Sequence, residues 1–135
     1  MKENNIIEQK SKAFALRIIK LYQWLTEAKH EFVLSKQVLR SGTSIGANVK
    51  EGIRAQSIPD FIAKFSIALK EAEETEYWLE LLHESGYIEE PSFTSIYEDN
   101  KEIVKLLIAI VKTTKVNNGI TLWILNCEFW IMFPI

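Results

Sequence analysis

The chain contains a single cysteine, Cys127, among its 135 residues. One thiol cannot cross-link a chain to itself, and residues 1–10 include no apolar run of the kind that a signal peptide requires. These two absences favour a reducing cytoplasm over secretion. With 47% hydrophobic residues at this length, one domain buries enough core to fold without a disulfide or a structural metal.

Catalytic motifs are also lacking. The sequence has no glycine-rich phosphate loop, no nucleophile elbow and only two histidines. Glu27 to His30 and Glu80 to His83 have the Glu-x-x-His spacing of carboxylate-bridged metal bundles, but Glu27 and His30 project away from the apolar stripe of their own helix. We therefore expect no catalytic residue, no metal, no cofactor and no enzymatic activity.

The net charge of −2 conceals two oppositely charged halves. Residues 1–70 carry 12 Lys and Arg against 6 Asp and Glu, a net of +6, whereas residues 71–135 carry 4 against 12, a net of −8. Such asymmetry favours a polyanionic partner on one side, or head-to-tail contact between copies of the chain. Ordinary solvated helix surfaces are the alternative interpretation.

Apolar residues recur at helical spacing in four segments. The pattern predicts helices over about residues 7–29, 34–56, 58–85 and 92–115, with Ser57 and Pro59 at the start of the third. In the second segment, Gly42, Gly46 and Gly52 lie inside the apolar arc, which indicates the close approach of another helix. Four long helices with short loops predict an all-α, antiparallel up-down four-helix bundle over residues 1–115.

The second segment also carries the most specific motif. The run E-F-V-L-S-K-Q-V-L-R-S-G-T-S-I-G-A-N, from Glu31 to Asn48, resembles the signature of bacterial four-helix-bundle proteins encoded within ribosomal RNA intervening sequences. Similar residues continue through Glu74-Thr75-Glu76-Tyr77-Trp78-Leu79 and Gly86-Tyr87-Ile88. The resemblance covers roughly residues 11–115 and includes no catalytic motif.

This resemblance implies an assembly as well as a fold. Proteins of that family are understood to form homopentameric rings, and the related accessory protein of diversity-generating retroelements binds a reverse transcriptase and nucleic acid. By this resemblance we expect a homopentameric scaffold. Its expected partners are RNA or DNA, or a reverse transcriptase or another RNA-processing protein.

Four cations of the second segment form a basic stripe. Lys36, Arg40, Lys50 and Arg54 project within roughly 40° of one line, nearly opposite the apolar arc. Such a stripe predicts nucleic-acid binding whose affinity falls as salt rises. A solvated helix face is the alternative, and the acidic total charge favours an alternative function, a protein-interaction module without direct nucleic-acid contact.

Apolar residues outside the core stripes predict a subunit interface. The interface residues predicted are Leu16, Ile19, Tyr22, Tyr77, Trp78 and Leu81. Closing the core is the alternative role for Trp24 and Trp78. Glu76 projects beside apolar positions of its helix, where a carboxylate requires a cation from a neighbouring helix or subunit.

Residues 116–135 form an atypical apolar tail. The 16 residues from Ile120 to Ile135 carry one charge, Glu128, and fall short of the roughly 20 residues that a membrane-spanning helix needs. A membrane anchor is therefore not favoured. The segment is β-prone and aggregation-prone, and an altered C-terminus is another interpretation.

Overall fold

The computed structural model describes residues 2–119, and the side chains from residue 5 onward. Four helices make up this part of the chain: α1 (Lys2–Glu27), α2 (Leu34–Ile53), α3 (Ile58–Glu84) and α4 (Ser92–Asn117). No strand occurs between residues 2 and 119. The all-α prediction is thus confirmed for this range.

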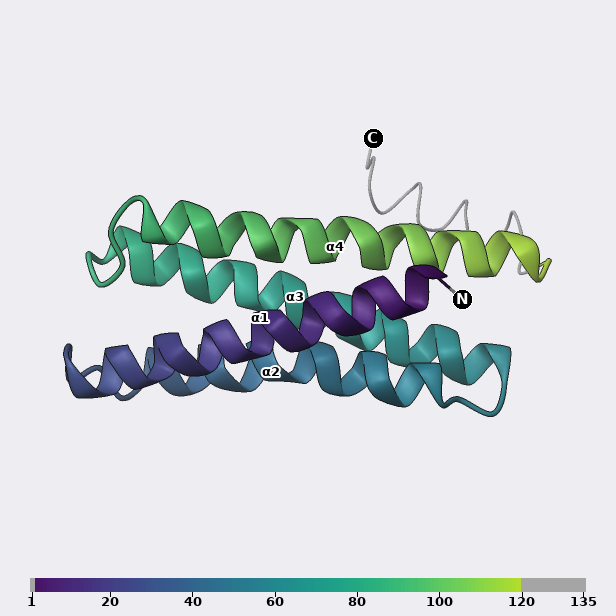
Figure 1. The fold of residues 1–135 in the computed structure, drawn as a ribbon, viewed down its shortest axis with the longest axis horizontal. Helices are drawn as coiled ribbons and strands as arrows, with labels where there is room; N and C mark the ends of the chain where they lie inside the picture. The colour runs from purple at the N-terminus through teal and green to yellow at the C-terminus, as the bar shows by residue number, and fades with distance from the viewer. Residues whose placement is uncertain (1, 120–135) are drawn as a thin grey trace, which may run out of the picture.

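The helices follow one another in antiparallel order (Figure 1). α1 lies beside α2 and α4, and α3 also lies beside α2 and α4, whereas the diagonal pairs α1–α3 and α2–α4 bring no Cα atoms within 8 Å of each other in the described range. This is the square arrangement of an up-down four-helix bundle, as the sequence predicted.

Three predicted boundaries need correction. α1 begins at Lys2 rather than near residue 7, and Ile7, one of its first apolar residues, is buried in the core. α2 ends at Ile53 rather than near residue 56, because Arg54 leaves the helical conformation and caps the end. α4 continues to Asn117, so the helix includes the first residues assigned to the tail.

One contiguous core joins the four apolar stripes. Its fully buried large side chains are Ile7, Phe14, Ile18 and Leu25 of α1, Val38, Ile45 and Val49 of α2, Phe65, Leu79 and Leu82 of α3, and Ile103 and Leu107 of α4. Ile88 extends this core into the loop between α3 and α4. The stripes recur at three and four residues, so each helix turns a single face inward.

Glycines bring α2 close to both neighbouring helices. A Cβ placed on Gly42 would lie 2.7 Å from Cγ1 of Ile18 in α1, and a Cβ on Gly52 would lie 2.5 Å from Cδ1 of Phe65 in α3. The predicted close approach is confirmed at these two positions. Gly46 differs, because its nearest neighbour, the Ser11 hydroxyl oxygen, is at an ordinary 3.4 Å.

Side-chain caps fix the starts of two helices. The Ser57 hydroxyl accepts a hydrogen bond from the Asp60 N–H, as expected for the start of α3. At α2 the cap is Glu31, whose carboxylate accepts hydrogen bonds from the N–H groups of Leu34, at 3.1 Å, and Ser35, at 2.7 Å. Glu31 thus satisfies first-turn donors of α2 that no side chain at the preceding residue caps.

The predicted C-terminal tail is described only at its start. Residues 120–135, including Cys127 and Glu128, lie outside the described residues. Within residues 2–119, no helix combines the length and the apolarity needed to cross a membrane.

Candidate nucleic-acid interface

Three cations of the predicted stripe lie free on the outer surface of α2. Lys36, Lys50 and Arg54 are exposed, and no carboxylate of residues 5–119 lies within ion-pair distance of them. The nearby Glu51, which the sequence placed at the margin of the stripe, pairs instead with Lys64 of α3 at 3.7 Å. The three charges are therefore available to an anionic partner.

Arg40, the fourth member of the stripe, is engaged. Its guanidinium donates to Glu71 of α3 at 3.1 Å and also to Glu74. Glu74 in turn accepts a hydrogen bond from the Trp78 indole at 3.1 Å. Arg40 thus links α2 to α3, and only three of the four predicted residues remain as a free basic surface.

Arg54 does not extend the helical line of the other cations. It occupies the C-cap of α2, with φ −94° and ψ 10°, just before the loop to α3. Lys36 lies near the opposite end of α2, in the helix's first turn. The free cations therefore span the full length of α2, about 27 Å at 1.5 Å per residue.

Ion pairs between helices neutralise some of the opposite charges of the two halves of the chain. Lys10 of α1 pairs with Glu102 of α4 at 2.8 Å, and Arg17 of α1 pairs with Asp99 of α4 at 2.5 Å. In both pairs, as with Arg40, the basic half of the chain supplies the cation and the acidic half the carboxylate. The asymmetry seen in the sequence therefore serves partly to join the two halves within one bundle.

The predicted interface residues divide into two groups. Leu16 and Tyr77 are more than half exposed, at 55% and 54%, and Ile19 is also exposed. The remaining three, Tyr22, Trp78 and Leu81, are half-buried. Trp78 packs against the core, with the Tyr77 ring centroid 5.3 Å from its own. Trp78 thus helps to close the core, and Leu16, Ile19 and Tyr77 are left as apolar surface.

The carboxylate of Glu76 is paired with a cation from a neighbouring helix, as the sequence predicted. Lys101 of α4 places its Nζ atom 3.7 Å from Oε1 of Glu76, and the Tyr97 hydroxyl lies 2.9 Å from the same atom. Tyr97 also donates to Glu80. Burial, together with these two carboxylates, raises the pKa of the Tyr97 phenol, so it remains a neutral donor.

The two Glu-x-x-His pairs do not converge on one site. Glu27 and His30 are both exposed at the end of α1, whereas Glu80 is bound by Tyr97. Nδ1 of His83 lies 2.8 Å from the Ile88 carbonyl oxygen. Among the residues that the structure describes, no group of three or more His, Cys, Asp or Glu side chains is placed to hold a metal ion.

Comparisons with known proteins agree with this fold. The family model described as 23S rRNA-intervening sequence protein matches residues 3–109. Among solved structures, the chain is similar to a protein of unknown function from the S23 ribosomal protein family of Bacteroides thetaiotaomicron VPI-5482. The two share 56% sequence identity over 82% of this chain and 98% of that chain, with a TM-score of 0.81. No curated protein matches the chain.

Proposed function

The chain belongs to the 23S rRNA-intervening sequence protein family, and we propose that it is a non-enzymatic cytoplasmic scaffold that binds RNA through the outer surface of α2. The observation that carries this proposal is the set of free cations Lys36, Lys50 and Arg54, spread along one helix without carboxylate partners among residues 5–119. Phosphates of a nucleic-acid backbone satisfy such cations without requiring any base sequence.

Self-association completes this proposal. Leu16, Ile19 and Tyr77 leave apolar surface uncovered on α1 and α3, and a second copy of the chain would cover it. A closed homopentamer would repeat the basic surface of α2 five times, and RNA contacting several copies would bind more tightly than one copy allows. DNA has the same backbone charges and is the other nucleic acid that this surface would accept.

A protein-interaction module is the second candidate. The net charge of −2 and the exposed carboxylates of Glu73, Glu84 and Glu98 on α3 and α4 favour a basic protein over a nucleic acid on that side of the bundle. A reverse transcriptase or another RNA-processing protein would suit this surface, because proteins that bind nucleic acid commonly carry basic patches. In this alternative, the basic face of α2 makes no RNA contact.

RNA binding by a charge-reversed variant tests the proposal. The variant carries Lys36→Glu, Lys50→Glu and Arg54→Glu, and leaves Arg40 in place so that the link to α3 is kept. A matched control carries Lys70→Glu, Lys105→Glu and Lys112→Glu, which change the net charge equally at exposed sites on α3 and α4. Affinity is measured by fluorescence anisotropy with a 20-nucleotide single-stranded RNA at low salt.

We expect the α2 variant to lose at least tenfold in affinity and the control to lose much less, because only the α2 cations contact phosphates directly. Equal losses in the two variants would mean that net charge alone governs binding. No binding by the wild-type protein would leave the protein-interaction module as the better account.

A further inference from the structure

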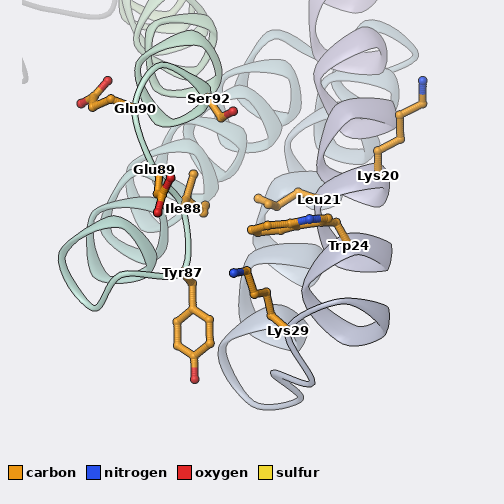
Figure 2. A pocket seen from close by; sticks show the side chains of 9 residues that line it. All are labelled: Lys20, Leu21, Trp24, Lys29, Tyr87, Ile88, Glu89, Glu90 and Ser92. Atoms are coloured by element: carbon orange, nitrogen blue, oxygen red, sulfur yellow. The ribbon is translucent and has the colours of Figure 1, made fainter.

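A cleft at one end of the bundle is separate from the outer surface of α2. It has a volume of about 470 Å³ and lies between the C-terminal end of α1 and the loop that joins α3 to α4. Figure 2 shows Trp24 and Lys29 reaching into the cleft from one side, with Ile88 and Glu89 on the facing loop. Its volume is within the range of small-molecule binding pockets.

Trp24 is more exposed than core packing requires. Its side chain is 41% exposed, whereas the next residue, Leu25, is fully buried and fills the core at this level. The Lys29 ammonium lies 5.3 Å from the centroid of the Trp24 ring system. A large, partly exposed aromatic surface with a cation nearby can stack a planar ring and hold an attached anion.

The charges around the cleft favour an anion. Lys20 and Lys29 have no ion-pair partner among residues 5–119, and Lys20 stands at the rim, one helical turn before Trp24. Glu90 is already engaged, since it accepts from the Thr94 hydroxyl and lies 3.5 Å from Nε2 of His83. Glu89 is therefore the one uncommitted carboxylate against two lysines within this lining.

We propose that this cleft binds one unpaired nucleotide of single-stranded RNA. The base stacks on the Trp24 indole, the phosphate is held by Lys29 with Lys20 at the rim, and the Glu89 carboxylate accepts a hydrogen bond from a ribose hydroxyl. Stacking on an exposed aromatic side chain is how proteins commonly hold unpaired bases, and the 2′-hydroxyl distinguishes RNA from DNA.

The location of the cleft suits the surface on α2. The C-terminal end of α1 and the first turn of α2 lie at the same end of the bundle, joined by the short loop that contains Lys29 (Figure 1). An RNA strand that runs along the outer surface of α2 and passes Lys36 would reach this loop next. The inference rests on the proposed RNA association and adds a site for an unpaired base at the end of that surface.

Short oligonucleotides test the cleft separately from α2. The probes are fluorescein-labelled pentamers, A5 RNA and its deoxy counterpart, measured by anisotropy with the full chain. Trp24→Ala is expected to weaken A5 RNA binding by about 5- to 150-fold, the loss typical of one stacked base. Trp24→Phe keeps an aromatic ring and should retain most of the affinity, and Lys29→Glu should weaken binding of both pentamers.

Two further variants sharpen the test. Ile108→Ala, which shortens an apolar side chain of α4 that is 42% exposed, close to the 41% of Trp24, should leave A5 binding unchanged. Glu89→Ala should weaken the RNA pentamer several-fold and spare the deoxy pentamer, because only RNA presents the 2′-hydroxyl. Thermal unfolding of each variant verifies that the bundle is intact.

The two proposals fail on different results. Equal A5 affinity in wild type, Trp24→Ala and Lys29→Glu would overturn the cleft, whatever the 20-nucleotide RNA does. Unchanged binding of the 20-nucleotide RNA by the α2 triple variant would overturn the proposed function of α2. In that case, A5 binding that still depends on Trp24 would support the cleft alone.

Discussion

Single residues decide how closely the helices of this bundle approach. Gly42 and Gly46 lie one helical turn apart on α2, yet only Gly42 abuts a branched side chain, that of Ile18. Gly42→Ala is expected to destabilise the protein by about 1–3 kcal/mol through overpacking. Gly46→Ala has room for its methyl group and should stabilise the protein by about 0.5–1 kcal/mol, because alanine favours a helix more than glycine does.

Urea unfolding of the two variants measures both effects on the same helix. The midpoint should fall for Gly42→Ala and rise for Gly46→Ala, with similar dependence on denaturant. A rise for both variants would contradict the close contact with Ile18.

Glu31 makes the stability of α2 depend on pH. Burial tends to raise the pKa of its carboxyl, but hydrogen bonds from the N–H groups of Leu34, Ser35 and Val33 outweigh burial and lower the pKa below its usual value. Glu31→Gln should therefore lower the free energy of unfolding by about 1–2 kcal/mol at neutral pH, the loss expected for a helix cap.

The sign of the pH effect follows from the lowered pKa. The stabilisation by Glu31 is present above the unfolded-state pKa and is lost as the pH falls through the lower folded-state pKa. The difference in unfolding free energy between wild type and Glu31→Gln should therefore shrink between neutral pH and about pH 3. A difference that stays constant over this range would show that the charge of Glu31 is not what caps α2.

At the scale of the elements, Arg40 and Lys36 lie one turn apart on α2 but have different roles. Arg40→Glu would place a third carboxylate beside those of Glu71 and Glu74. The repulsion should destabilise the bundle by about 1 kcal/mol. Within the described part of the chain, Lys36 has no such carboxylate partner, so Lys36→Glu should leave stability nearly unchanged. Thermal unfolding at low and high salt is the measurement, and the Arg40→Glu loss should shrink at high salt.

The helices themselves could be predicted from the sequence, because each buries one stripe whose period shows in the chain. Ser57 could likewise be recognised as a cap, since it stands directly before Pro59 and the acidic Asp60. The Glu31 cap was missed because its carboxylate reaches forward across a non-helical stretch. That contact depends on the path of the loop and not on helical spacing.

Contacts between helices were harder to predict for a similar reason. The period of α2 placed Arg40 correctly on the outer side, but its pairing with Glu71 and Glu74 depends on how α3 packs beside α2. The partners do stand three residues apart on α3, a spacing that puts them on one side of that helix. The cleft beside Trp24 could not be predicted from helical spacing, because its facing wall is formed by the loop between α3 and α4.

At the scale of the whole molecule, the exposed apolar residues of α1 predict self-association. Leu16→Glu combined with Ile19→Glu should reduce the mass measured by multi-angle light scattering, because charges would replace apolar surface in the contact. Wild type should exceed 15.6 kDa, and a pentamer would have about 78 kDa, five times that mass. Gln23→Glu, also exposed on α1, is the control.

Assembly through another surface would leave the mass of the double variant unchanged. A wild-type protein that stays at 15.6 kDa across micromolar concentrations would contradict the proposed assembly altogether.

RNA binding through the α2 cations is the central claim, and the salt dependence of affinity tests it most directly. For single-stranded RNA, the slope of log K against log salt concentration is about −0.7 for each phosphate neutralised. The triple variant at Lys36, Lys50 and Arg54 should therefore have a slope smaller in magnitude by about 2 for each protomer in contact with the strand. The control triple variant at Lys70, Lys105 and Lys112 should keep the wild-type slope. Identical slopes in wild type and the α2 variant would contradict the claim.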